Sequence, residues 1–159
     1  MPVAKRALLV VMILALALCA SAAAAQPRPV GDPCSQDEVT IPLLFDLYAG
    51  RVDPSEGDVL DVLAARLAAC PGRAFELQVH TDTVRVSSFN ARQSRAVAEH
   101  VRELLGARGV AAARLAPCGY GESRPLAHDP SWDGRSPNYR LVVRALRGAA
   151  SSHRCPDVR

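Results

Sequence analysis

Residues 74–80 (AFELQVH) alternate between apolar and polar side chains, a pattern that predicts a β-strand with one buried face. Residues 139–146 (YRLVVRAL) alternate in the same way and predict the final strand. The apolar, partly β-branched run at 38–48 predicts a first strand, which Pro42 places at a sheet edge. Residues 113–121 (ARLAPCGYG) predict a short strand that runs into a glycine turn.

Two stretches repeat apolar residues at helical spacing. The first, at 52–70, begins with helix-capping residue types around Pro54 and ends before the Pro-Gly pair at 71–72. The second covers 88–108 and is followed by Gly109, where a glycine is expected after a helix. The residues predicted to face inward are Val59, Leu60, Leu63 and Leu67 in the first helix and Ala98, Val101, Leu104 and Leu105 in the second.

The predicted elements follow one another in the order β-α-β-α-β-β. This order is typical of an α+β sandwich in which two helices cover one face of a four-stranded mixed sheet. We assign residues 38–147 to this domain and the Pro-rich, polar segment 26–37 to a leader or linker. Residues 148–159 form a polar C-terminal tail, which we expect to be loose apart from any tether through Cys155.

The N-terminal segment 1–25 has the pattern of a secretory signal peptide. Lys5 and Arg6 precede an apolar run at 7–18, which is short for a transmembrane helix. The small residues that follow suit cleavage before Gln26. We therefore expect export to the periplasm, with no membrane span in the mature chain; an uncleaved membrane anchor is the alternative.

Cys19 raises a second alternative, an outer-membrane lipoprotein that is lipidated at this cysteine. A bacterial lipobox has a small residue immediately before the cysteine, and here that residue is Leu18. Simple secretion is therefore the favoured interpretation.

Charge and composition exclude several classes of function. The formal charge of +3 loses two units with Lys5 and Arg6, so nothing indicates nucleic-acid binding. The 4 histidines are scattered without an HExxH pattern, and no serine or cysteine lies in a recognisable nucleophile frame. We therefore expect neither catalysis nor a cofactor.

Cys34, Cys70, Cys118 and Cys155 lie beyond the predicted signal peptide, and an even number in an exported protein predicts two disulfides. Three connectivities are open. Cys34 precedes the first predicted strand and Cys155 follows the last, so we pair these two as a staple between the termini and pair Cys70 with Cys118. Free buried thiols are the alternative. No two of these cysteines have the short spacing that structural zinc ligands favour, so no metal site is predicted.

Several motifs occur in a characteristic order between residues 39 and 146. LFD lies at 44–46, VHTD at 79–82, GYGESRP at 119–125 and DGRSPNYRLVV at 133–143. With these motifs the chain resembles the OmpA-like C-terminal domain, the module that holds bacterial outer-membrane proteins to peptidoglycan.

The resemblance implies a site for the diaminopimelate side chain of a peptidoglycan stem peptide, whose end carries an ammonium and a carboxylate. In the family pattern an aspartate complements the ammonium, an asparagine orients the ligand, and an arginine binds the carboxylate through paired hydrogen bonds. Carried over to this chain, these positions are Asp82, Asn90 and Val97. Ser94 matches as well, so the alignment needs no gap and Val97 is a true substitution.

The substitution at Val97 implies weakened binding unless another residue replaces the missing arginine. Arg85 lies in the loop three residues after Asp82 and is the candidate replacement; a solvated loop arginine is the alternative. Thr81 and Arg140 are further candidate binding residues.

Other family positions have structural interpretations. Arg135, Asn138 and Arg140 match a motif that is expected to tie the last loop to the sheet, although Arg140 can also border the pocket. Gly119 and Gly121 are expected to serve a turn that requires positive φ.

We therefore expect a noncatalytic periplasmic protein that binds peptidoglycan, with weakened affinity. The alternative is a disulfide-stapled scaffold that contacts other envelope proteins without binding peptidoglycan. The retained Asp82 and Asn90 favour binding, whereas Val97 and Arg85 favour the scaffold.

Overall fold

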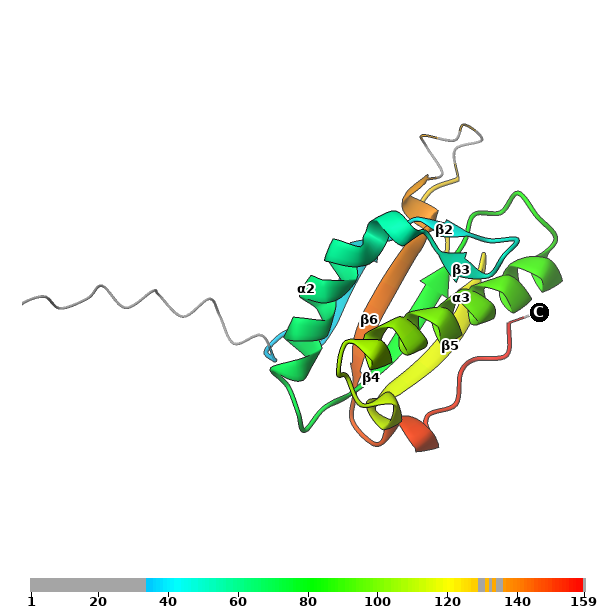
Figure 1. The fold of residues 1–159 in the computed structure, drawn as a ribbon. Coiled ribbons are helices and arrows are strands. Elements are labelled where there is room, and N and C mark those ends of the chain that lie inside the picture. The colour runs from blue at the N-terminus through cyan, green and yellow to red at the C-terminus, as the bar shows by residue number, and fades with distance from the viewer. Residues whose placement is uncertain (1–33, 129–130, 132, 134–135, 159) are drawn as a thin grey trace, which may run out of the picture. The chain divides into compact units, whose positions relative to one another are not determined.

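The computed structural model describes residues 34–128, 131, 133 and 136–158. The predicted signal peptide, its cleavage position and Cys19 lie outside this part of the chain. Figure 1 shows a sheet with two helices, α2 (Gly57–Ala68) and α3 (Ser87–Ala107), packed on the same face. The predicted α+β sandwich is confirmed.

The sheet has four strands in the order β1-β6-β4-β5. Strand β4 (Ala74–His80) pairs in parallel with β5 (Leu115–Gly121) and antiparallel with β6 (Arg140–Leu146). Strand β1 (Glu38–Pro42) pairs antiparallel with β6 and forms the other edge. The sheet is therefore mixed, as the order of elements predicted.

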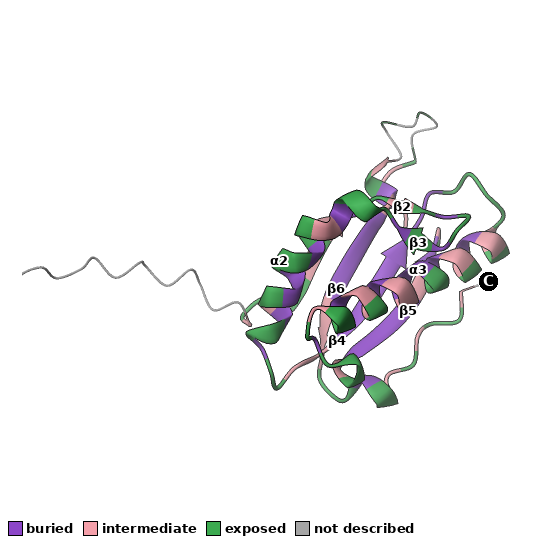
Figure 2. Ribbon diagram, in the orientation of Figure 1, coloured by how far each residue is buried: buried purple, intermediate pink, exposed green. Residues whose placement is uncertain are grey.

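The hydrophobic core lies between the sheet and the two helices. Leu77 and Val79 of β4 are fully buried there, as are Val97 and Val101 of α3. Figure 2 shows the buried strands beneath helices whose outer faces are exposed. The predicted inward positions are confirmed with one exception: Val59 is 37% exposed, because the buried stripe of α2 consists of Leu60, Leu63, Ala64 and Leu67.

The predicted first strand at 38–48 was too long. Strand β1 ends at Pro42, and a separate hairpin follows, made of β2 (Phe45–Asp46) and β3 (Arg51–Val52). Asp46 turns the chain, because its Oδ1 accepts the backbone N–H groups of Tyr48 at 2.8 Å and Ala49 at 3.0 Å. The extended pattern therefore breaks at a proline and an aspartate turn.

The predicted disulfide pairing was wrong. Cys34 bonds to Cys70 and Cys118 bonds to Cys155, so the two termini are not stapled to each other. The chain entering β1 passes the C-terminal end of α2, where the Cys34 Sγ lies 3.6 Å from the carbonyl oxygen of Ala69. The tail instead runs beside β5, the strand that carries Cys118 (Figure 1).

The C-terminal tail is packed rather than loose. The short helix η4 (Ala150–Ser152) follows β6, and Ala150 is buried. The adjoining His153 imidazole lies 3.1 Å from the carboxylate of Glu76 on the sheet face opposite the helices. The tail therefore covers part of this face, in addition to the tether through Cys155.

Candidate functional site

The predicted binding residues gather at one edge of the sheet. Because β4 and β5 are parallel, the residues that follow them, Asp82 and Glu122, leave the sheet at the same edge. Helix α3 begins there and supplies Asn90 in its first turn. Strand β6 starts at this edge with Arg140, which lies directly opposite His80.

Asn90 connects the segments that meet at this edge. Its Nδ2 donates to the carbonyl oxygens of Asp82 at 3.1 Å and Arg85 at 3.3 Å, and to Glu122 Oε2 at 2.5 Å. Three acceptors around one nitrogen fix the orientation of the amide. Its Oδ1 is buried and has no hydrogen-bond partner among the described residues, so it keeps an unused capacity to accept a hydrogen bond.

Thr81 and Asp82 lie below the surface of the site, with 1% and 2% of their areas exposed. The backbone N–H of Thr81 donates to the carbonyl oxygen of Gly121 at 2.9 Å, which extends the pairing of β4 with β5. Asp82 Oδ1 accepts the backbone N–H of Val84 at 3.3 Å and turns the chain into the loop at 83–86. That loop is exposed to solvent.

Glu122 belongs to the site although the sequence analysis did not predict it. Its Oε2 accepts from Asn90, and its Oε1 accepts from the Ser87 hydroxyl at 2.5 Å. Its place follows from the parallel pairing of β4 and β5, which brings the residue after Gly121 beside the residues after His80 and is not visible in the local sequence pattern. A second carboxylate therefore accompanies Asp82 at this edge.

Ser94, Gly119 and Gly121 join β5 to α3. The Ser94 hydroxyl accepts the backbone N–H of Gly121 at 2.9 Å. Gly121 has φ +49°, as predicted, but Gly119 does not have a positive φ. Gly119 instead allows close packing, since a Cβ there would lie 2.3 Å from the backbone nitrogen of Arg95.

Val97, at the family's arginine position, is fully buried. It packs in the hydrophobic core with Val79, Val101 and Leu141 rather than at a polar surface. Val97 therefore serves to pack the hydrophobic core.

Arg85 is exposed, and its guanidinium carbon lies 4.5 Å from the centre of the Tyr48 ring. Tyr48 comes from the turn of the β2–β3 hairpin and also packs against Phe89 of α3, with ring centres 5.5 Å apart. Sequence reasoning missed Tyr48, because the hairpin was hidden within the predicted first strand.

Arg140 and Asn138 hold the segment between β5 and β6. Asn138 Oδ1 accepts the backbone N–H groups of Leu126 at 2.7 Å and Ala127 at 3.1 Å. The Arg140 guanidinium donates to the carbonyl oxygens of Arg124 at 3.0 Å and Asn138 at 3.3 Å. Both therefore tie this segment to the sheet, whereas Arg135 of the same motif lies outside the described residues.

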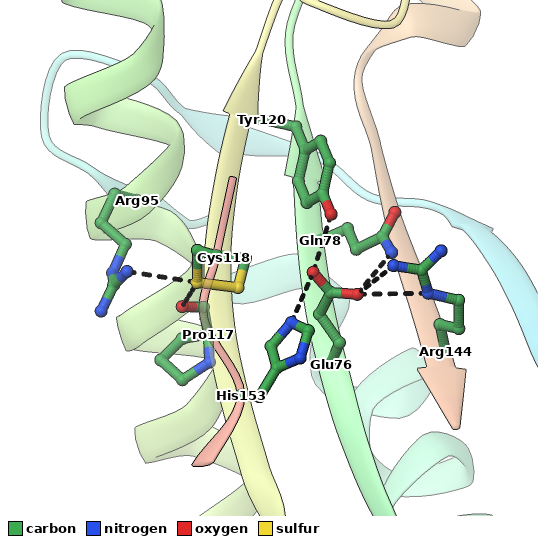
Figure 3. Close-up of polar contacts among 9 residues, drawn as sticks. Glu76, Gln78, Arg95, Pro117, Cys118, Tyr120, Arg144 and His153 are labelled. Atoms are coloured by element: carbon green, nitrogen blue, oxygen red, sulfur yellow. Dashed lines mark hydrogen bonds and ion pairs between the residues drawn. A yellow bond between two sulfur atoms is a disulfide. The ribbon is translucent and has the colours of Figure 1, made fainter. Parts of the chain in front are cut away.

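A second polar cluster lies on the sheet face opposite the helices, centred on Glu76 (Figure 3). This fully buried carboxylate accepts from Tyr120 at 2.7 Å, Arg144 at 2.6 Å and Gln78 at 2.8 Å. Burial alone would raise the pKa of Glu76, but these hydrogen bonds, together with the nearby His153 imidazole, outweigh it and lower the pKa to about 2. Glu76 is therefore a structural anion.

Glu76, Cys118 and His153 bring potential metal-ligand atoms within 4.8 Å of one another. The sulfur of Cys118 is bonded to Cys155, however, and so is not a thiolate that can bind a metal. The Glu76 oxygens already accept hydrogen bonds from Gln78, Tyr120 and Arg144, and one of them lies 3.1 Å from the His153 imidazole. The arrangement is that of an anchor for the tail.

None of the helices in the described part of the chain is both long and apolar enough to cross a bilayer.

Comparison with known proteins places this arrangement in a family. Residues 44–139 match the model of the OmpA family. Outer membrane porin F of Pseudomonas fluorescens is 36% identical over 104 residues, which cover 65% of this chain and 32% of the porin. The peptidoglycan-binding protein ArfA of Mycobacterium tuberculosis is 28% identical over 121 residues, which cover 72% of this chain and 37% of ArfA.

The chain thus spans about a third of the length of these relatives. Among solved structures, the peptidoglycan-associated lipoprotein of Burkholderia pseudomallei superimposes with a TM-score of 0.61 at 23% identity, covering 75% of this chain and 98% of that one. This likeness supports the fold, and the match at 44–139 shows the family. The chain belongs to the OmpA family.

Proposed function

We propose that this protein is a noncatalytic component of the periplasmic cell envelope that binds peptidoglycan noncovalently at the Asp82–Asn90–Glu122 edge of its sheet. The observation that carries the proposal is the convergence of three segments on Asn90, whose buried Oδ1 accepts no hydrogen bond from the described residues. A relative named for peptidoglycan binding supports the ligand class.

The ligand that suits this edge is a stem peptide with an ammonium-bearing side chain of the diaminopimelate type. The carboxylates of Asp82 and Glu122 complement an ammonium, and the Oδ1 of Asn90 can accept one of its hydrogens. Asp82 is only 2% exposed, so binding requires its carboxylate to become accessible to the ligand. Thr81 and Arg140 support the site by holding its backbone segments.

Arg85 is the residue that we assign to the ligand carboxylate in place of the family arginine. Val97 is enclosed in the core and offers no polar group to a ligand. Arg85 is exposed, and its backbone carbonyl oxygen accepts a hydrogen bond from the Asn90 amide. Loss of the family contact without full compensation predicts weaker affinity than an arginine at position 97 would confer.

A second function has support from different observations. The burial of Asp82, the apolar Val97 and the two disulfides suit a rigid scaffold that contacts other envelope proteins without binding peptidoglycan. The two functions differ in one measurable property, which is the affinity for the cell wall.

Cosedimentation with purified sacculi tests the proposal. We expect the mature protein to sediment with sacculi and Asp82→Asn to reduce the bound fraction severalfold, because this change removes charge while preserving shape. Asp61→Asn is the matched control. Asp61 lies on α2, where it forms a surface ion pair with Arg108. Failure of the wild-type protein to sediment, or equal retention of the two variants, would favour the scaffold.

Export also belongs to the proposal. We infer that cleavage leaves Gln26 as the first residue of a periplasmic protein. Mass spectrometry of the mature N-terminus tests this, because an acylated Cys19 would establish a lipoprotein instead.

A further inference from the structure

Tyr48 is held in a defined position at the turn of the β2–β3 hairpin. Its backbone N–H donates to Asp46 Oδ1, and its ring packs against Phe89 at an interplanar angle of 58°. The ring nevertheless remains part of the surface, with 62% of the residue exposed. An exposed aromatic ring with fixed backbone contacts is suited to orienting another side chain.

The hairpin itself is fixed against α3. The backbone N–H of Val52 donates to the Nδ1 of His100 at 3.0 Å. Gly50 has φ +64°, and a Cβ at this position would lie 2.8 Å from the Cβ of Ala96, so only glycine allows this approach. The position of Tyr48 relative to the first turn of α3 is therefore set by the fold.

Arg85 is held at both ends. Its carbonyl oxygen accepts from Asn90, and its guanidinium lies over the face of the Tyr48 ring. A guanidinium that packs over an aromatic face is attracted to the ring, and its N–H groups can still form paired hydrogen bonds with a carboxylate. Ordering the side chain beforehand lowers the entropy lost when a ligand binds.

We propose that Tyr48 is a positioning residue that holds Arg85 as the carboxylate-binding group of the site, so that the hairpin determines the preference for a ligand carboxylate. This inference rests on the proposed function. Binding of peptidoglycan does not itself require that Tyr48 position Arg85. Tyr48 acts through Arg85 and does not itself need to touch the ligand.

Isothermal titration of the full mature protein with two synthetic stem peptides tests the inference. The peptides differ only in the carboxyl group of the diaminopimelate side chain, which is free in one and a carboxamide in the other. We expect the wild-type protein to prefer the free carboxylate by roughly tenfold, the effect of one charge-assisted interaction. Arg85→Ala should bind both peptides equally.

Two variants separate the role of the tyrosine ring from general packing. Tyr48→Leu keeps an apolar contact with Phe89 but removes the π face, and it should reduce the preference to roughly two- to threefold. Tyr48→Phe keeps the ring and should retain the wild-type preference. Arg102→Ala is the control for loss of surface charge, because Arg102 pairs with Glu99 on the distal part of α3, and it should leave the preference unchanged.

The outcomes distinguish the inference from the proposed function. Equal binding of both peptides by the wild-type protein, or an unchanged preference in Tyr48→Leu, overturns the inference and leaves peptidoglycan binding standing. Binding of neither peptide overturns both. Circular dichroism and thermal unfolding establish that each variant is folded before titration.

Discussion

Glu76 and His153 lie 3.1 Å apart, and their contact joins the middle of the sheet to the C-terminal tail. The glutamate is on β4 and fully buried, whereas the histidine follows η4. Two residues further along the chain, Cys155 forms a disulfide with Cys118 of β5. The tail is therefore attached to two neighbouring strands, by one noncovalent and one covalent link.

The two disulfides offer a matched pair of variants. The loops that they close are similar in length, with sequence separations of 36 for Cys34–Cys70 and 37 for Cys118–Cys155. Removing either disulfide should therefore lower the free energy of unfolding by about 3–4 kcal/mol. Only Cys118→Ser/Cys155→Ser should also release the tail. Denaturant unfolding checks the first expectation, and amide hydrogen exchange over residues 149–155 checks the second. Equal loss of tail protection in both double variants would contradict the proposed attachment.

Replacing Glu76 with glutamine should destabilise the protein by about 2–3 kcal/mol at neutral pH, because charge-assisted hydrogen bonds weaken. The lowered pKa of about 2, against an ordinary 4.5, means that the stabilisation is present above pH 4.5 and is lost as the pH falls toward 2. The difference between wild type and Glu76→Gln should therefore shrink across this range in denaturant titrations. A constant difference would show that the charge is not responsible.

His80 should make the stability of the fold decrease with acid at a higher pH than Glu76 does. Burial, with repulsion from Arg140 and Arg124, lowers its pKa to about 3, and among the described residues neither ring nitrogen has a hydrogen-bond partner. The unfolded chain takes up a proton below pH 6.5 while the folded protein does not, so stability falls as the pH drops from 6.5 toward 3.

We therefore expect His80→Phe, which preserves the ring contact with Tyr120, to remove about 2 kcal/mol of this loss at pH 5. Thermal unfolding at pH 7 and pH 5 measures the effect. A variant that retains the wild-type dependence between these values would assign it to other groups.

Val97 should matter for stability and not for ligand binding. Val97→Ala leaves a cavity in the core and should lower the unfolding free energy by about 1–3 kcal/mol. Val62→Ala on α2 is the control, since Val62 is 73% exposed and should have almost no effect. Cosedimentation of folded Val97→Ala with sacculi should equal that of wild type, and a selective loss of binding would contradict the packing role.

Replacing two glycines with alanine should change the stability in opposite directions. Gly119→Ala would force a methyl group against the backbone of α3 and should cost more than about 2 kcal/mol. Gly106 has open space around the position of its Cβ and lies within α3, so Gly106→Ala should stabilise the helix by about 0.5–1 kcal/mol. Chemical unfolding of the two variants measures the contrast, and equal effects would refute the close approach of β5 to α3.

The spacing of apolar residues was sufficient to predict the strands and helices that bury one regular face. Strand β4 covers Ala74–His80, as the alternation at 74–80 predicted, and α3 begins one residue before the predicted start. The period of side chains along a strand or helix is set by the backbone, so a buried face is visible in the sequence. The order and spacing of the VHTD, GYGESRP and DGRSPNYRLVV motifs likewise indicated the family before any contact was known.

Contacts between distant segments required the folded structure. The disulfide pairing, the place of Glu122 beside Asn90 and the contact of the Arg85 guanidinium with the Tyr48 ring each join residues whose separation in the sequence carries no signal of proximity. The sequence by itself determined the two helices, the central strands of the sheet and the family, because these depend on local periodicity and motif spacing. The tertiary structure alone decided which cysteines pair, what covers the outer face of the sheet and which side chains surround Asn90, because those depend on how the strands and the tail come together in space.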